Sequence, residues 1–165
     1  MNNININFEY SLSSKEYIEI ANSVGWNNYS KKQVDKALDS TMYVIKALVN
    51  GKLAGMGRVV GDTSLVCMLC DICVKPEFQH KGIGVMIVNN LKAKILSGVL
   101  KNEQMQIGLT PIAGHENFYK KAGFNFNPDK ITGMYLLINK WKLKRIKILY
   151  VIILILLLHN FPFKF

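Results

Sequence analysis

Residues 74–84 read Val-Lys-Pro-Glu-Phe-Gln-His-Lys-Gly-Ile-Gly and connect an apolar run to a segment with helical periodicity. The run from Leu65 to Val74 is too short for an independent helix and predicts a buried strand. This strand ends at Pro76, because proline has no N–H to donate. Downstream, apolar residues recur every fourth position, at Ile83, Ile87, Leu91 and Ile95. That periodicity predicts a helix over 82–96 with one buried face.

The glycine-rich turn between this strand and this helix favours binding of an anion such as phosphate. The first N–H groups of a helix have no intrahelical acceptor and lie at the positive end of its dipole. Successive N–H groups from Gln79 to Gly84 would therefore point out of the helix start.

Two motifs in this chain resemble the GNAT superfamily of N-acetyltransferases. Gln79-His80-Lys81-Gly82-Ile83-Gly84 is similar to the family's Gln/Arg-x-x-Gly-x-Gly/Ala pyrophosphate loop, and Val-Lys-Pro-Glu-Phe resembles its usual strand exit. Downstream, Asn-Phe-Tyr-Lys-Lys-Ala-Gly-Phe at 117–124 resembles the family's later aromatic helix, at about the expected distance. The resemblance covers roughly residues 8–138 in layout, and its specific part lies within 65–124.

Local signals elsewhere predict the remaining elements. Ser13 and Ser30 each precede a Glu or Gln by three residues, a capping-box signature for helices running to about Gly25 and Asp39. Asn50-Gly51 lies between two apolar runs and predicts a hairpin, since both residues tolerate positive φ. The expected strands are 4–8, 42–49, 53–60, 65–74, 105–110 and 134–138, and a later helix is expected over 114–122.

The order of these elements predicts an α/β fold. The chain has 165 residues, half of them apolar, which is enough for one domain with a hydrophobic core. We expect a single GNAT-like domain over 1–140, with a mixed, mostly antiparallel twisted sheet flanked by helices.

The resemblance implies an acyl-CoA-dependent N-acetyltransferase. Such an enzyme moves an acetyl group from acetyl-CoA to a primary amine of an unidentified small molecule or peptide, by direct attack. The alternative is a catalytically silent CoA-binding or regulatory module. The residues expected to bind acetyl-CoA are the loop Gln79, His80, Lys81, Gly82, Ile83 and Gly84 for the pyrophosphate, the strand backbone of Ile72, Cys73 and Val74 for the pantetheine arm, and Phe118.

Tyr119 matches the family tyrosine that donates a proton to the leaving sulfur. A phenol with a pKa of about 10 is still protonated when a thiolate with a pKa of about 8.5 departs. The other interpretation is a core aromatic side chain beside Phe118 and Phe124. Many relatives also carry an asparagine about six residues before this tyrosine, which contacts the pantetheine, and the corresponding place here is near Ala113.

Asp71 is the only carboxylate on the expected central strand, and alternation puts it opposite Ile72 and Val74. It either takes the proton from the incoming ammonium, directly or through water, or is a hydrogen-bonded buried acid. The sequence leaves both roles open. Trp26, Tyr29 and Arg58 are further candidates for the acceptor cleft, without a diagnostic pattern.

Three cysteines at 67, 70 and 73 have the spacing C-x-x-C-x-x-C on the expected strand. Alternation sends Cys67 and Cys73 to one face and Cys70 to the other, so three thiolates cannot converge on one ion. We therefore expect structural thiols and no metal. An odd count of cysteines and no N-terminal secretory signal predict a reducing, cytoplasmic location.

The positive charge is concentrated at the C-terminal end. The chain carries a net charge of +10, but residues 139–165 hold six of its basic residues and no acid, which leaves +4 for the rest. A nucleic-acid interface would need a basic stripe on a folded face, so we expect no nucleic-acid partner. A modestly basic body suits a polyanionic substrate such as acetyl-CoA.

The C-terminal extension, residues 141–165, has an unknown role. Its apolar run Ile148–Leu158 would cover about 16 Å as a helix, against a hydrocarbon core of about 30 Å. Homodimerisation, contact with an anionic membrane surface and an accidental extension are the alternatives. Membrane contact ranks lower, because the run has no polar face.

Overall fold

The computed structural model of the chain describes residues 5–26, 28–62, 64–99 and 105–124. The strand expected at 134–138 and the extension 141–165 lie outside these ranges, so the division at residue 140 stays a prediction. The elements in chain order are β1 (Ile6–Glu9), α1 (Ser14–Ser23), α2 (Lys31–Asp39), β2 (Tyr43–Val49), β3 (Lys52–Gly61), β4 (Val66–Val74), a 3-10 turn (Pro76–Phe78), α3 (Ile83–Leu96), β5 (Gln106–Gly108) and α4 (Glu116–Lys121). None of these helices is long and apolar enough to cross a membrane.

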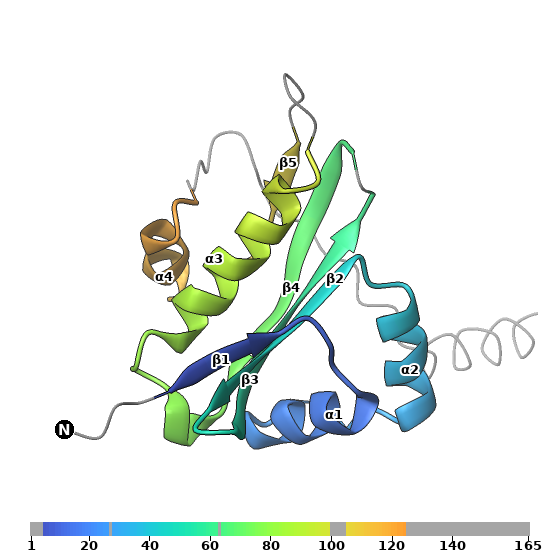
Figure 1. Cartoon of the computed structure of the whole chain (residues 1–165), viewed down its shortest axis with the longest axis vertical. Coiled ribbons are helices and arrows are strands. Elements are labelled where there is room, and N and C mark those ends of the chain that lie inside the picture. Colours follow the sequence, from blue (N-terminus) through green and yellow to red (C-terminus); the bar gives the residue numbers. More distant parts are fainter. Residues whose placement is uncertain (1–4, 27, 63, 100–104, 125–165) are drawn as a thin grey trace, which may run out of the picture. The chain divides into compact units, whose positions relative to one another are not determined.

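The sheet has the order β1-β2-β3-β4-β5, as Figure 1 shows. The first four strands pair antiparallel, and β5 pairs parallel with β4. Two parallel neighbours require a crossover, and α3 lies in it. The expected mixed, mostly antiparallel sheet flanked by helices is therefore confirmed.

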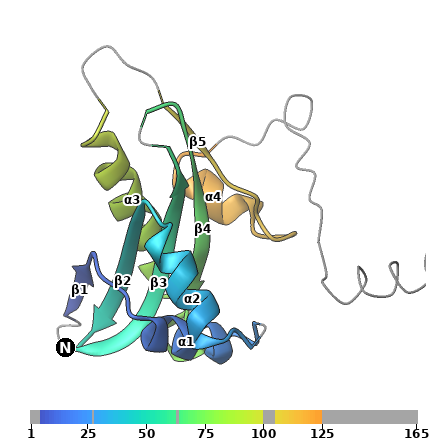
Figure 2. The ribbon, with the colours of Figure 1, turned by 90° about the vertical axis from the view of Figure 1, so that its right-hand side faces the viewer.

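Helices cover both faces of this sheet, and each face has its own apolar core. Helix α3 packs on one face against β2, β3 and β4, with Ile83, Ile87, Leu91 and Ile95 at most 1% exposed. Helices α1 and α2 pack on the other face around Met56 and Cys73. The side view shows α2 and α3 on opposite sides of the central strands (Figure 2).

The helix caps and the hairpin turn that the sequence predicts are present in the structure. Ser13 Oγ accepts the N–H of Glu16, and the Glu16 carboxylate accepts the N–H of Ser13 at 2.7 Å, which completes the capping box. Ser30 caps α2 by accepting the N–H of Gln33. Asn50 and Gly51, with φ of 50° and 75°, form the tight turn between β2 and β3.

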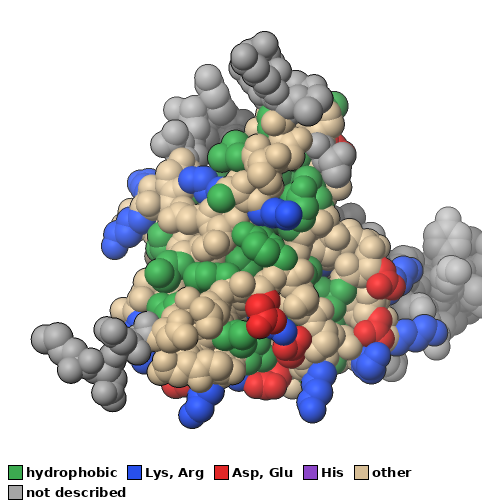
Figure 3. Space-filling model, viewed as in Figure 1, with side chains coloured by type: hydrophobic (Ala, Val, Ile, Leu, Met, Phe, Trp, Pro, Cys, Tyr) green, Lys and Arg blue, Asp and Glu red, His purple; other side chains and the backbone are tan. Residues whose placement is uncertain are grey.

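Several charged side chains of the described residues form ion pairs. Lys46 is paired with Glu9 and Glu16 at 3.1 and 2.7 Å, and Lys31 is paired with Asp35 along α2. On the face drawn in Figure 3, basic and acidic side chains are mixed around a central apolar region. The described part of this view carries no continuous basic stripe.

A β-bulge interrupts β4. Met56 pairs with Cys73 and Arg58 pairs with Cys70, so Gly57 alone lies opposite two residues, Asp71 and Ile72. Asp71 takes up the extra residue with a φ of 53°. Beyond this point the alternation of side chains along β4 changes phase.

The bulge corrects the prediction for the cysteines. Cys67 packs in the core beneath α3, whereas Cys73 packs in the core beneath α1 and α2, so the expectation that they share a face is wrong. Simple alternation has a period of two, and one inserted residue reverses it. Asp71 does lie opposite Ile72 and Val74, as expected, because the alternation is regular from Asp71 onward. All three cysteines are free thiols.

Gly57 leaves room for the bulged strand. A Cβ on this residue would lie 2.8 Å from Ile72 Cδ1 and 2.9 Å from both Ile87 Cγ2 and Leu91 Cδ1. These three side chains belong to the closely packed core beneath α3. The absence of a side chain at residue 57 therefore permits α3 to approach the sheet at the bulge.

We predict that Gly57→Val lowers the free energy of unfolding by about 1–3 kcal/mol, because the added methyl groups overpack this core. Urea denaturation monitored by circular dichroism measures the change. Lys52→Val is the matched control, since Lys52 is an exposed residue of the same strand and its replacement should stay within about 0.5 kcal/mol of wild type. Equal stability of the two variants would contradict the role given to Gly57.

Candidate active site

The turn between β4 and α3 presents unpaired backbone donors. His80 and Gly82 have φ of 59° and 79°, and these left-handed residues turn the chain into the helix. The first N–H of α3 to bond within the helix is that of Met86, to Gly82 O at 3.1 Å. The N–H groups of residues 83–85 have no intrahelical acceptor, and Gly82 has no side chain to cap them. The helix start is therefore suited to an anion.

Two side chains of the turn stabilise its own backbone. Gln79 Nε2 donates to Val74 O at 2.9 Å, and Lys81 Nζ donates to Glu77 O at 2.8 Å. Both polar groups are thus occupied in holding the turn. The Gln79 N–H also donates to Pro76 O at 3.2 Å, so of the N–H groups expected to point outward that of Gln79 is already bonded.

A pocket of about 600 Å³ extends from this turn along β4 to α4. Nine of the ten residues expected to bind acetyl-CoA line it, and Lys81 does not. Strand β5 pairs with β4 only from Val66 to Met68, so the rest of β4 has no paired neighbour on this side within the described ranges. We call this space the donor pocket.

Helix α4 brings Tyr119 to the donor pocket. The neighbouring Phe118 packs on the first turn of α3, where a Cβ on Gly84 would lie 3.1 Å from the Phe118 ring. Tyr119 makes edge-to-face contacts with Phe118 and Phe124, with ring centroids 4.7 and 6.2 Å apart. Burial raises the pKa of Tyr119, and the nearby Cys70 adds to this shift. The phenol therefore stays protonated at neutral pH.

Asn117 also lines the donor pocket, whereas Ala113 is exposed and does not. The position that corresponds to the family asparagine, near Ala113, therefore contributes no side chain to this pocket. The amide residue that lines the pocket is Asn117, four residues further along the chain.

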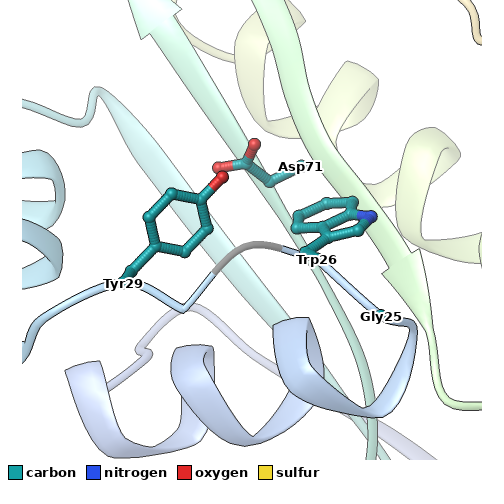
Figure 4. Close-up of a pocket in the computed structure, with 4 residues that line it drawn as sticks. All are labelled: Gly25, Trp26, Tyr29 and Asp71. Atoms are coloured by element: carbon teal, nitrogen blue, oxygen red, sulfur yellow. The ribbon is translucent and has the colours of Figure 1, made fainter. Parts of the chain in front are cut away.

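A second, smaller pocket of about 420 Å³ lies beside the donor pocket. Its lining residues are Gly25, Trp26, Tyr29 and Asp71, shown in Figure 4. The Tyr29 hydroxyl and the Trp26 indole both lie toward the Asp71 carboxyl group in this view. Trp26 lines both pockets, so the two spaces adjoin. We call the smaller one the acceptor pocket.

Asp71 is held by side chains from two other elements. Tyr17 of α1 donates its hydroxyl to Asp71 Oδ2 at 3.0 Å, and Arg58 Nε of β3 donates to the same oxygen. Arg58 Nη1 also donates to Thr41 Oγ1 at 2.7 Å and to Ala37 O at 3.2 Å. Within the described residues, Asp71 Oδ1 has no donor, so it is available to a ligand.

This network affects the titration of Tyr17. Burial raises the pKa of Tyr17, and the Asp71 carboxylate raises it further because it disfavours a second negative charge nearby. Tyr17 therefore acts as a permanent hydrogen-bond donor to Asp71. The sequence suggested no role for Tyr17, since its spacing from Ile20 and Ala21 indicates only the buried face of α1.

Most of the candidate residues are thus brought together. Tyr119 lies at the donor pocket, Asp71 lies at the acceptor pocket, and the bulged part of β4 runs between the two. Asp71 is hydrogen-bonded, as one of its two interpretations requires, and it also lines a pocket, as the other requires. Trp26, Tyr29 and Arg58 take part in the acceptor pocket or contact Asp71 directly.

Comparisons with known proteins identify a family for this chain. Residues 39–126 match the family model described as acetyltransferase (GNAT) domain. The chain is 30% identical over 124 residues to the uncharacterized N-acetyltransferase ycf52 of Pyropia yezoensis, covering 73% of this chain and 69% of that protein. It is 31% identical over 84 residues to GCN5-related N-acetyltransferase 2, chloroplastic, of Arabidopsis thaliana, covering 51% of this chain and 31% of that protein.

Solved structures share the fold. A probable acetyltransferase of unknown function from meticillin-resistant Staphylococcus aureus superposes with a TM-score of 0.71 at 21% identity, covering 81% of this chain and all of that one. Glucosamine-6-phosphate N-acetyltransferase from Arabidopsis thaliana superposes with a TM-score of 0.60 at 16% identity, covering 80% of this chain and 99% of that one.

Proposed function

This chain belongs to the GNAT family of acetyltransferases, and we propose that it transfers an acetyl group from acetyl-CoA to a primary amine of a small molecule or peptide. The observation that carries the proposal is the pair of adjoining pockets on either side of the β4 bulge. One pocket joins a helix start with N–H groups that have no intrahelical acceptor to a protonated tyrosine, and the other contains the Asp71 side chain. Transfer between two substrates requires two such spaces that meet.

The donor pocket fits acetyl-CoA in size and in donors. Its volume, about 600 Å³, falls within the range of small-molecule sites. The N–H groups at the start of α3 would hold the pyrophosphate. The edge of β4 at residues 72–74, which has no paired neighbour on this side within the described ranges, would bond to the pantetheine arm as an added strand does. A bulge leaves its extra residue outside the ladder, so a main-chain N–H there would serve the thioester oxygen as negative charge develops.

Tyr119 would protonate the sulfur that leaves. Its hydroxyl keeps its proton because burial raises its pKa, and a general acid must be protonated when the leaving group departs. The packing of its ring between Phe118 and Phe124 would fix the direction of the hydroxyl.

The acceptor pocket is suited to a positively charged amine. Asp71 supplies a negative charge, and Trp26 and Tyr29 supply aromatic faces for a cation. Among the described residues, none of those that line the pocket is basic. Arg58 is already bonded to Asp71, Thr41 and Ala37. A phosphorylated amino sugar would therefore meet only the negative charge of Asp71, and we expect acceptors without an anionic group to be preferred.

The second candidate function is a CoA-binding module without catalytic activity, because the donor pocket alone would serve it. Release of free thiol from acetyl-CoA in the presence of an amine panel separates the two functions. Binding without any acceptor-dependent thiol release would favour the silent module, and no binding at high micromolar acetyl-CoA would exclude both. The cytoplasmic location stays a prediction.

We predict that Gly82→Trp abolishes acetyl-CoA binding in calorimetric titration. The indole would occupy the place of the pyrophosphate, and a φ of 79° strains any L-residue. Gly51→Trp is the matched control, because Gly51 has a φ of 75° and open space around it in the hairpin turn. Retained affinity in Gly82→Trp would show that the loop assignment is wrong.

We predict that Tyr119→Phe lowers kcat by about ten- to a thousand-fold and leaves the acetyl-CoA Kd within a few-fold, as expected for loss of a general acid. Stopped assays of free thiol measure kcat, and calorimetry measures Kd. Tyr43→Phe is the control, since Tyr43 packs at the edge of the α3 core outside the donor pocket. Equal turnover of wild type and Tyr119→Phe would assign Tyr119 to packing alone.

We predict that Asp71→Asn raises KM for a cationic amine by about ten-fold or more, because the ammonium loses its counter-charge, while the acetyl-CoA Kd stays unchanged. Initial rates over a range of amine concentrations give KM. Asp62→Asn is the control, since Asp62 only accepts main-chain N–H groups of the β3–β4 turn. An unchanged KM in Asp71→Asn would remove Asp71 from the acceptor pocket.

A further inference from the structure

Helix α4 is too short to hold Tyr119 in place by itself. It has six residues, and its N-cap residue, His115, makes no side-chain capping bond. A helix of this length is unstable alone, because the first turn costs more conformational entropy than its few hydrogen bonds return. The position of Tyr119 therefore depends on contacts made by the two ends of α4.

The C-terminal end of α4 closes around Tyr119. Phe124 N donates to Tyr119 O at 3.1 Å, and Gly123 N donates to Lys120 O at 2.9 Å, with Gly123 at a φ of 84°. These two bonds and the left-handed glycine form a Schellman motif. The Tyr119 and Phe124 rings make the apolar contact that accompanies this motif, with centroids 6.2 Å apart. Both the carbonyl and the ring of Tyr119 thus belong to the closing turn.

Lys92 of α3 contacts this closing turn directly. Its Nζ donates to Ala122 O at the C-cap and lies 5.6 Å from the centroid of the Phe124 ring. The same Nζ would lie 3.2 Å from a Cβ on Gly123. A cation at a helix C-terminus is favourable, since it meets the negative end of the dipole and a carbonyl without an intrahelical donor.

Helix α3 therefore holds α4 at two points. Gly84, in the first turn of α3, contacts the Phe118 ring, and Lys92 bonds to Ala122 about two turns further along α3. The first contact lies beside the helix start that would bind the pyrophosphate. The second contact reaches only the turn that contains Tyr119 and Phe124.

We propose that Lys92 is a positioning residue for Tyr119, a role that rests on the proposed function. Lys92 does not line the donor pocket and touches neither substrate site. It fixes the closing turn of α4 so that the Tyr119 hydroxyl stays directed at the donor pocket. Its removal should therefore affect protonation of the leaving sulfur and leave binding of acetyl-CoA unchanged.

Three variants at two positions test this role by steady-state kinetics. Lys92→Met keeps the length of the side chain and removes its charge and its donor. We expect it to lower kcat about ten-fold, within the hundred-fold that a displaced catalytic group can cost, with the acetyl-CoA KM within two- to three-fold of wild type. Lys92→Arg, which retains a cationic donor, should restore most of the turnover. Lys94→Met is the matched control, since Lys94 lies over the Tyr10 and Tyr43 rings away from α4.

A double-mutant cycle with Tyr119→Phe shows whether Lys92 acts through the phenol. If it does, Lys92→Met lowers kcat in the wild-type background and has almost no effect in the Tyr119→Phe background. An equal loss in both backgrounds, or a loss in Lys92→Met that appears in acetyl-CoA KM instead of kcat, would overturn the proposal.

Hydrogen exchange provides a readout that needs no activity. We expect amides of residues 116–124 to exchange faster in Lys92→Met than in wild type or Lys94→Met, because α4 loses its C-terminal contact with α3. Unchanged exchange in Lys92→Met would overturn the proposal. A wild-type chain that exchanges as expected but transfers no acetyl group would instead overturn the proposed function.

Discussion

The bulge in β4 opposite Gly57 is the constraint on which the site depends. One inserted residue reverses the alternation of side chains along β4. The residues after the bulge therefore face the opposite side of the sheet from the one that a regular strand would give them. Ile72 and Val74 join the α3 core and border the donor pocket, while Asp71 turns to Tyr17 and the acceptor pocket. A single strand therefore separates the two proposed substrates and contacts both.

Helix α3 supports the donor side through three separate features of one element. Its start presents free N–H groups, its glycine at position 84 admits the Phe118 ring, and Lys92 bonds to the end of α4. Its buried residues Ile83, Ile87, Leu91 and Ile95 pack in the main core and are at most 1% exposed. Because the helix is closely packed, it fixes the loop proposed to bind the pyrophosphate and the helix that carries Tyr119 relative to each other, which a reaction between fixed groups requires.

The acceptor side is held by a charge network instead. Arg58 links Asp71 to the end of α2 through Ala37 and Thr41, and Tyr17 adds a bond from α1. The Arg58 and Asp71 side chains are only 14% and 21% exposed, so loss of one charge would leave the other incompletely solvated. The network thus fixes the orientation of the carboxylate.

Within the described residues, the sequence by itself determined the elements and the order in which they occur. The capping box at Ser13, the Asn50-Gly51 turn and the loop at 79–84 depend on conformational preferences of adjacent residues, and all three are observed. Local preferences did not predict that Tyr119 and this loop lie at one pocket. That expectation came from the resemblance to a family. Only the tertiary structure decided where β4 bulges, which face Cys73 takes, and that Tyr17 meets Asp71 across 54 residues of chain. These features depend on how separate elements pack. The alternation of side chains along a strand predicts neither an inserted residue nor a contact with a distant residue.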